Sequence, residues 1–205
     1  MNWTIVIPVK RLDEAKSRLR PDLADVADLA LAFATDTIVA ARNSMLVDEV
    51  IVVTPDVRVA ERATALGAWI VPDPGIGLNA AATAGIRAAH TGGIAVLTGD
   101  LPALSTADLD GALLLAELFE LSMVADHSGV GTTLIASSNG AALEPRFGPR
   151  SRERHETAGH AVLSIPVGSA LRWDVDTVTD LATALTLGIG EATASVVSTR
   201  AEHPA

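Results

Sequence analysis

Short runs rich in β-branched residues alternate with longer helical patterns along the first half of this chain. We expect strands at five such runs, which are residues 4–9, 49–54, 68–72, 94–100 and 121–126. Strands that alternate with helices are typical of βαβ units on a parallel sheet. The predicted fold class is therefore α/β, a Rossmann-like and mostly parallel sheet with helices on both faces.

The length and composition fit one domain of this class. The chain has 205 residues, of which 49 % are apolar and 3 % aromatic, so Ala, Val, Leu and Ile must build the core. A chain of this length buries most of the surface that its unfolded form exposes. We expect residues 1–191 to form a single domain and residues 192–205 to form a flexible C-terminal tail.

Local signals predict where several helices begin and end. Ser105 and Thr177 each stand three positions before an aspartate, which is the spacing of a capping box. Thr54, Pro55 and Gly67 have the character of an N-cap, a first helical residue and a C-terminal stop.

The net charge of −10 narrows the range of partners. A nucleic acid or an anionic membrane would repel such a chain unless a strong basic patch intervened. The longest apolar segment, residues 112–121, contains two glutamates and is too short to span a bilayer. The first residues lack the basic and apolar regions of a signal peptide. We therefore expect a cytoplasmic protein with no nucleic-acid or membrane partner.

Cysteine and histidine offer little chemistry in this sequence. Cysteine is absent, which excludes disulfides, thiolate catalysis and cysteine-ligated metal sites. The histidines form no close ligand pair, and His155 and His160 are predicted to be helix-surface residues without a role.

Three aspartates stand where ligands reach α/β sheets. Asp100 ends an apolar run, and ligands bind beyond the carboxyl ends of the strands in open α/β sheets. Asp174 and Asp176 are two positions apart in a segment predicted to be extended, which would direct both carboxylates to one side. Three carboxylates without His or Cys partners favour Mg²⁺ or Mn²⁺. The alternatives are a helix-capping turn for Asp100 and a solvated strand end for the pair.

A second candidate site lies in residues 146–154, where four arginines are crowded together, namely Arg146, Arg150, Arg152 and Arg154. Ser151 could begin a helix there, and a helix N-terminus beside arginines suits a phosphate or a carboxylate. The glycine-rich residues 129–133 could add backbone amides. The alternative is a solvated charged loop that Glu153 and Glu156 balance.

Residues 75–80 match the G-x-G-x-x-A pattern of dinucleotide-binding turns. Pro72, Asp73 and Pro74 separate these glycines from the preceding strand, so the tight turn that brings amides to a pyrophosphate is interrupted. An NAD-dependent oxidoreductase would also leave Asp174 and Asp176 unexplained. It stays a remote alternative.

Five segments taken together resemble the guanylyltransferases of coenzyme F420 biosynthesis, and they are residues 8–19, 77–85, 97–104, 147–155 and 173–177. That family couples GTP to a small phosphorylated three-carbon acid, either phosphoenolpyruvate or 2-phospho-L-lactate, and releases pyrophosphate. The resemblance implies a nucleotidyltransferase fold with the nucleotide at the carboxyl edge of the sheet.

The resemblance also implies roles for single residues. Asp100, Asp174 and Asp176 would hold Mg²⁺ or Mn²⁺ and act in catalysis, and Asn79 would lie near the guanine. A second group would cradle the acid, and its members are Thr132, Gly148, Ser151 and Arg150. Relatives often have a small residue in place of Arg150, so the approach of substrate to the backbone there differs.

The only two lysines, Lys10 and Lys16, both lie in the opening segment. Two polyanions that meet in a chain of net charge −10 need cations at the meeting point, and these lysines are placed to supply them. Lys10 and Lys16 are therefore predicted to bind the nucleotide, and Lys16 to take part in catalysis. The alternative is a general bias toward arginine over lysine.

The expected reaction is attack by a phosphate oxygen of the acid on the α-phosphorus of GTP. A phosphate monoester is already anionic, so catalysis would rest on positioning and charge neutralisation. The Ala- and Arg-rich composition, typical of actinobacterial proteins, favours phosphoenolpyruvate over 2-phospho-L-lactate. A non-catalytic GTP-binding module and assembly into a homo-oligomer are left open.

Overall fold

The computed structural model describes residues 2–16, 19, 26–90, 92–140 and 143–202. The sheet contains strands β1 (Trp3–Pro8), β2 (Val47–Thr54), β3 (Trp69–Pro72), β4 (Gly93–Leu97), β5 (Leu121–Ala125), β6 (Thr132–Ser137) and β7 (Ala161–Val162). The helices are α1 (Val26–Arg42), α2 (Val57–Ala65), α3 (Leu78–Ala88), α4 (Thr106–Ala116), α5 (Ser151–Thr157), the 3₁₀ turn η1 (Ala170–Arg172), α6 (Val178–Leu187) and α7 (Glu191–Glu202).

The strands form one seven-stranded sheet in the order β3-β2-β1-β4-β6-β5-β7. Every neighbouring pair is parallel except those of β6, which runs antiparallel to both β4 and β5. The first four strands in the chain therefore make a parallel half-sheet, as the alternation predicted. The looser pattern after residue 122 corresponds to the reversal at β6.

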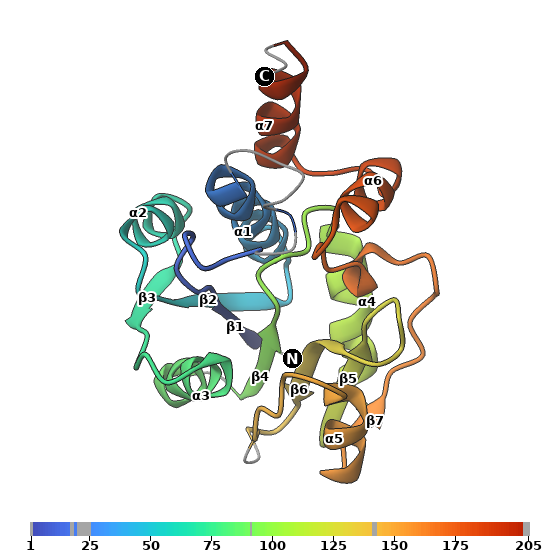
Figure 1. The fold of residues 1–205 in the computed structure, drawn as a ribbon. Coiled ribbons are helices and arrows are strands. Elements are labelled where there is room, and N and C mark those ends of the chain that lie inside the picture. The colour runs from blue at the N-terminus through green and yellow to red at the C-terminus, as the bar shows by residue number, and fades with distance from the viewer. Residues whose placement is uncertain (1, 17–18, 20–25, 91, 141–142, 203–205) are drawn as a thin grey trace.

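Helices cover both faces of the sheet, as Figure 1 shows. Helices α1, α2 and α4 pack on one face, and the apolar side chains of that core include Ile5 and Ile7 of β1. Helix α3 packs on the other face, where Val6 of the same strand is buried beside Ala82. Alternate residues of a strand point to opposite faces, so an apolar run such as β1 must be covered on both sides.

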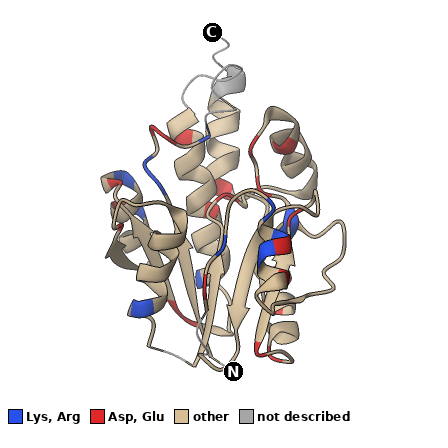
Figure 2. Cartoon of the chain, turned by 60° about the horizontal axis from the view of Figure 1, so that its bottom comes forward, with Lys and Arg blue, Asp and Glu red and all other residues tan. Residues whose placement is uncertain are grey.

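Charge is almost excluded from the strands. Among the described strands only β2 carries charged residues, which are Asp48 and Glu49 near its start, and the other strands have the colour of uncharged residues in Figure 2. Acidic and basic side chains are instead carried by the helices and loops. No helix in the described part of the chain has the length and hydropathy that a membrane span requires.

The predicted capping residues are confirmed for two helices. Ser105 accepts a hydrogen bond from the Asp108 amide at the start of α4, and Thr177 forms a full capping box with Asp180 at the start of α6. The prediction for α2 was wrong by two positions, because Asp56 rather than Thr54 is its N-cap.

The C-terminal segment differs from the flexible tail expected from residue 192. Helix α7 extends from Glu191 to Glu202, and its first turn is anchored in the fold. The Asp36 side chain of α1 accepts hydrogen bonds from the amides of Ala192 and Thr193, at 3.0 and 2.9 Å. A buried carboxylate thus caps a helix that weak local sequence signals did not indicate.

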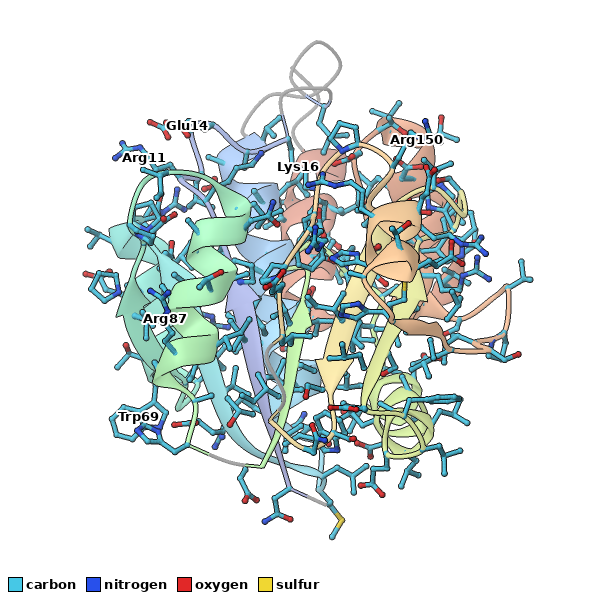
Figure 3. The ribbon with its side chains drawn as sticks, turned by 90° about the horizontal axis from the view of Figure 1, so that it is seen from below. Arg11, Glu14, Lys16, Trp69, Arg87 and Arg150 are labelled. Carbon is cyan, nitrogen blue, oxygen red and sulfur yellow. The ribbon has the colours of Figure 1, made fainter. Side chains whose placement is uncertain are left out.

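The loops that follow the strands gather at one end of the sheet. Figure 3 shows Lys16 and Arg150 at this end, whereas Trp69, which starts β3, lies at the opposite end. Lys16 follows β1, and residues 98–100 follow β4. The carboxyl edge of the parallel half-sheet is therefore where the predicted residues of both candidate sites meet.

Close packing of α3 on the sheet predicts a sharp difference between two glycines. A Cβ atom at Gly85 would lie 2.3 Å from Val6 Cγ1 and 2.9 Å from Val53 Cγ2. We expect Gly85→Ala to lower the free energy of unfolding by about 1–3 kcal/mol through overpacking. Gly111→Ala in α4 meets no described atom within 4 Å and should be neutral or stabilising by about 0.5–1 kcal/mol. Urea unfolding of both variants checks this, and equal effects would contradict it.

Candidate active site

A buried lysine lies between two aspartates at the carboxyl edge. Lys16 Nζ contacts the Asp100 carboxylate and lies 3.0 Å from Asp176 Oδ1. Its side chain is only 8 % exposed, and its backbone adopts a left-handed conformation with φ 52°. Asp100 and Asp176 lie 84 and 160 positions from Lys16 in the sequence, and both are paired with its ammonium group.

The segment with Asp174 and Asp176 is held against the end of β4. The Val175 amide donates to the Asp100 carbonyl at 3.1 Å, and the Val175 side chain is fully buried. Asp180 of α6 accepts hydrogen bonds from the amides of Asp176 and Thr177. The segment is irregular rather than a strand, and Asp174 and Asp176 stand on either side of the buried Val175.

The site is electrostatically strained at Asp174. Burial, followed by the nearby charges of Asp100, Asp176 and Asp126, raises the pKa of Asp174 to about 8. Burial alone would lower the pKa of Lys16, but the charges of Asp100 and Asp176 outweigh it and raise that pKa. Lys16 is therefore a permanent cation, and the cluster has more negative charge than this cation neutralises.

The carboxylate oxygens of this site are of the type that hard divalent cations bind. In the part of the chain that the structure describes, Asp100 Oδ1 and Asp174 Oδ1 are buried and accept no hydrogen bond, and His127 Nδ1 lies 3.7 Å from the latter. Carboxylate oxygens are ligands that such cations prefer. Among the described residues, however, no three acidic or histidine side chains are already grouped as a metal site. The binding of metal by all three aspartates accordingly stays a prediction.

An aromatic stack supports the acidic segment from the side. His127 lies on Trp173 with ring centroids 4.2 Å apart and an angle of 8° between the planes. The His127 amide donates to the Arg172 carbonyl, and the Arg172 guanidinium donates to the carbonyls of Ala125 and Asp126. The end of β5 and the chain before Asp174 therefore form one connected structure.

Asp126, which the sequence analysis did not single out, borders both candidate sites. Its charge contributes to the raised pKa of Asp174, and its carboxylate accepts a hydrogen bond from the Val130 amide. The Val130 carbonyl in turn accepts from the Arg152 amide of α5. The signal that could have identified Asp126 is the same as for Asp100, an acid directly after an apolar strand.

The arginine-rich segment begins α5 after a strained turn. Gly148 has φ 115°, and Arg150, directly before the helix, has φ 55°. The structure pairs Arg146 with Glu144, Arg150 with Glu153 and Arg152 with Glu156. Arg150 is 73 % exposed, which makes it the most accessible cation of these pairs. Both readings of this segment thus keep support: the arginines are balanced by glutamates, and they surround a helix N-terminus.

Thr132, Ser151 and His155 meet beneath this turn. Ser151 Oγ donates to Thr132 Oγ1 at 3.2 Å, and His155 Nδ1 lies 3.1 Å from the same oxygen. The prediction that His155 and His160 lie on a helix surface is wrong, because they are 0 % and 5 % exposed. Helix α5 packs against β5 and is hydrogen-bonded to Thr132 at the start of β6, a long-range contact that the sequence did not reveal.

The Asn79 side chain is hydrogen-bonded to the arginine-rich segment. Its side-chain amide accepts from the Phe147 amide at 2.8 Å and donates to the Phe147 carbonyl at 3.2 Å. Both polar ends of Asn79 therefore bind the arginine-rich segment, and a contact with guanine stays a prediction. Lys10 is exposed, whereas the Lys16 side chain is nearly buried, so the two lysines differ in their surroundings.

Two cavities lie beside this edge rather than in it. A cavity of about 610 Å³ is lined by Asp36, Arg62 and Glu191 and includes none of the three clustered aspartates. A smaller one of about 350 Å³ is lined by Arg146, Arg150 and Arg154, with Glu153, but not by Thr132 or Ser151. The geometry of the polar groups therefore identifies the site better than cavity size does.

The raised pKa of Asp174 predicts a pH-dependent stability change in the metal-free protein. The native carboxyl titrates near pH 8 rather than near 3.8, so its contribution to stability is complete below about pH 3.8 and lost as the pH rises through about 8. Asp174→Asn should therefore raise the melting temperature at pH 9 by about 3 °C or more, and progressively less toward pH 4.

Thermal melts with a chelator check this, and Glu61→Gln on the exposed face of α2 serves as a control. If Asp174→Asn were less stable than the wild type at pH 9, the ionised carboxylate would be well stabilised and the strain argument would fail.

Comparison with known proteins places this arrangement in a family. The family described as "Guanylyl transferase CofC like" matches residues 3–197. The phosphoenolpyruvate guanylyltransferase of Streptomyces scabiei is 44 % identical over 209 residues, and the alignment covers 97 % of each chain. The protein of the same name from Streptomyces coelicolor is 45 % identical with the same coverage.

Solved structures agree on the fold. A putative nucleotide-diphospho-sugar transferase from Desulfovibrio desulfuricans superposes with a TM-score of 0.72 at 17 % identity, over 98 % of this chain and 96 % of that one. A more distant neighbour is glucosyl-3-phosphoglycerate synthase from Mycobacterium tuberculosis in complex with Mn²⁺ and uridine diphosphate. It has a TM-score of 0.52 at 16 % identity, and the match covers 93 % of this chain and 81 % of that chain. With the family match over nearly its whole length, the chain belongs to the CofC-like guanylyl transferases, which are nucleotidyltransferases.

Proposed function

We propose that this chain transfers the guanylyl group of GTP to phosphoenolpyruvate and releases pyrophosphate. The observation that carries the proposal is the buried Lys16 among three aspartates at the carboxyl edge of the sheet. The two Streptomyces relatives, both named for this reaction, support the choice of substrates. By its resemblance to the same family, the reaction belongs to coenzyme F420 biosynthesis.

The proposed transfer requires no general base from the protein. A phosphate oxygen of the acid forms a bond to the α-phosphorus of GTP, and the bond from that phosphorus to the β-phosphate bridging oxygen breaks. Because the attacking oxygen is already anionic, the residues must position two anions and offset their repulsion.

Lys16 has the properties required of a charge-stabilising group. It is nearly buried, its charge is held by two carboxylates, and its raised pKa keeps the ammonium protonated at neutral pH. In a site of low polarity such a fixed cation interacts strongly with negative charge that develops on a leaving phosphate. Lys10, exposed at the start of the same loop, would contact the outer phosphates.

In this proposal Asp100, Asp174 and Asp176 hold Mg²⁺ or Mn²⁺, which when bound would neutralise phosphate charge. The buried Oδ1 atoms of Asp100 and Asp174, which accept no hydrogen bond from the described residues, support this assignment. The excess of carboxylates over Lys16 also supports it, since a cation would relieve the repulsion that raises the pKa of Asp174.

The acid would bind at the start of α5. Thr132 and Ser151 supply hydroxyl groups, Gly148 allows a close backbone approach, and Arg150 supplies an exposed cation. A phosphorylated carboxylic acid has two anionic ends, which suits a helix N-terminus flanked by arginines. Asn79 takes part through Phe147, because its amide holds that part of the segment on α3.

The direct test is pyrophosphate release from GTP with Mg²⁺ or Mn²⁺ and with each acid in turn. We expect release with phosphoenolpyruvate, and little with 2-phospho-L-lactate, ATP in place of GTP, or no acid. Binding of GTP without pyrophosphate release in any mixture would contradict the proposal and indicate a nucleotide-binding module.

Substitution of Lys16 should damage turnover more than any exposed cation does. We expect Lys16→Ala to lower kcat/KM by about 10²–10³-fold, the range for loss of one preorganised charge-stabilising group. Lys16→Arg should restore little, because a planar guanidinium does not replace a compact ammonium between two carboxylates. Arg87→Ala, an exposed cation on α3 that Figure 3 shows away from Lys16, is the control.

Steady-state kinetics of the three variants measure this. Near-normal activity in Lys16→Ala would assign the lysine a purely structural role in holding the loop.

A further inference from the structure

His155 is a buried histidine between the arginine-rich segment and the hydroxyl groups of Thr132 and Ser151. It lies on α5, one turn after Ser151, and its side chain is fully enclosed. Its two ring nitrogens face different partners: Nε2 lies 2.9 Å from the Arg146 amide, and Nδ1 lies 3.1 Å from Thr132 Oγ1. The same ring contacts Phe147 edge-on, at 5.3 Å between centroids. One side chain therefore connects the arginine-rich segment to the hydroxyl pair.

The partners of His155 determine its tautomer. A backbone amide can only donate, so Nε2 must accept from Arg146 and carries no proton. Burial, followed by the electrostatic interactions with His160, Arg154 and Arg146, lowers the pKa of His155 to about 4, so the ring is neutral at pH 7. A neutral imidazole without a proton on Nε2 has it on Nδ1. The Nδ1–H group therefore donates to Thr132 Oγ1, and the ring also has a hydrogen bond with the Ser151 backbone.

This assignment leaves one hydroxyl proton to be placed. Thr132 and Ser151 have one hydroxyl proton each, and a single hydrogen bond between the two oxygens uses one of them. His155 adds a donor to the pair and cannot accept from it. Among the described residues, no hydrogen bond to a protein acceptor accounts for the second proton. The pair thus retains one O–H donor for a ligand.

We propose that His155 is a positioning residue for the acid substrate, which holds the Thr132–Ser151 pair so that one hydroxyl donates to an anionic oxygen of that substrate. The inference rests on the proposed function, because it needs an anion at this pair. His155 would not touch the substrate. Its Nδ1–H group fixes the direction of the hydrogen bond between Thr132 and Ser151. Its bond from the Arg146 amide links this direction to the conformation of the arginine-rich segment.

Three substitutions separate positioning from mere support. His155→Asn places an N–H close to the position of Nδ1 and loses the acceptor for Arg146, whereas His155→Gln can place an acceptor near Nε2 and loses the donor to Thr132. His155→Leu loses both. We expect Leu and Gln to raise the KM for phosphoenolpyruvate by about tenfold or more, the effect of a lost hydrogen bond to a charged group.

His155→Asn should keep that KM within about threefold of the wild type, and the KM for GTP should stay within about twofold in all three variants. A purely structural role predicts otherwise: both KM values would rise together, or Gln would preserve acid binding as well as Asn. Either result would overturn the inference. His160→Gln is the matched control, since His160 is also buried and contacts His155 but does not reach Thr132.

A measurement on the wild-type protein does not depend on the variants folding. Nitrogen NMR of protein with ¹⁵N-labelled histidine should show His155 protonated at Nδ1 and unprotonated at Nε2 at pH 7. The opposite tautomer, or a doubly protonated ring, would overturn the inference. Failure of the proposed function is distinguishable, because the wild type would then release no pyrophosphate with any acid while the tautomer would be unchanged.

Discussion

The ion pairs of Lys16 with Asp100 and Asp176 join the segments on which the active edge depends. The chain has a net charge of −10, and three aspartates converge where β4 and the irregular segment after η1 meet. Without a cation these carboxylates would repel one another and separate the two segments. Lys16 follows the turns after β1 and itself adopts a left-handed backbone conformation, with φ 52°. The same arrangement that permits the fold also presents a fixed positive charge to a bound nucleotide.

The topology of the sheet explains why two chemically different regions lie close together. The parallel strands β1 and β4 deliver Lys16 and Asp100 to the carboxyl edge, whereas the antiparallel β6 begins there with Thr132. The reversal therefore brings the first residue of one strand beside the residues that follow its neighbours. Asp126, at the end of β5, connects the regions through its charge and its bond to the Val130 amide. This arrangement suits a reaction between a nucleotide and a separate small anion.

The aspartate region and the region at the start of α5 have opposite electrostatic character. In the aspartate region, burial and then the charges of the neighbouring aspartates raise the pKa of Asp174 to about 8, and Lys16 only partly offsets them. The region at α5 contains several arginines and a neutral histidine, and burial, followed by the charges around the ring, lowers the pKa of His155 to about 4. A divalent cation would relieve the first, and an anionic substrate would balance the second. The electrostatic asymmetry thus matches the assignment of metal and phosphates to one side and the acid to the other.

Sequence alone predicted much of this protein, and the limits of prediction have a common cause. The alternation of strands and helices, the caps at Ser105 and Thr177 and the acids after apolar runs depend on local periodicity and on chemistry that neighbouring residues express. Four features were not predictable in this way. They are the burial of His155, the hydrogen bonds between Asn79 and Phe147, the different exposure of Lys10 and Lys16, and the capping of α7 by Asp36. Each depends on residues far apart in the chain that meet only after the helices pack on the sheet. Local sequence determined which residues could do chemistry, and tertiary packing decided which of them face a substrate and which hold others in place.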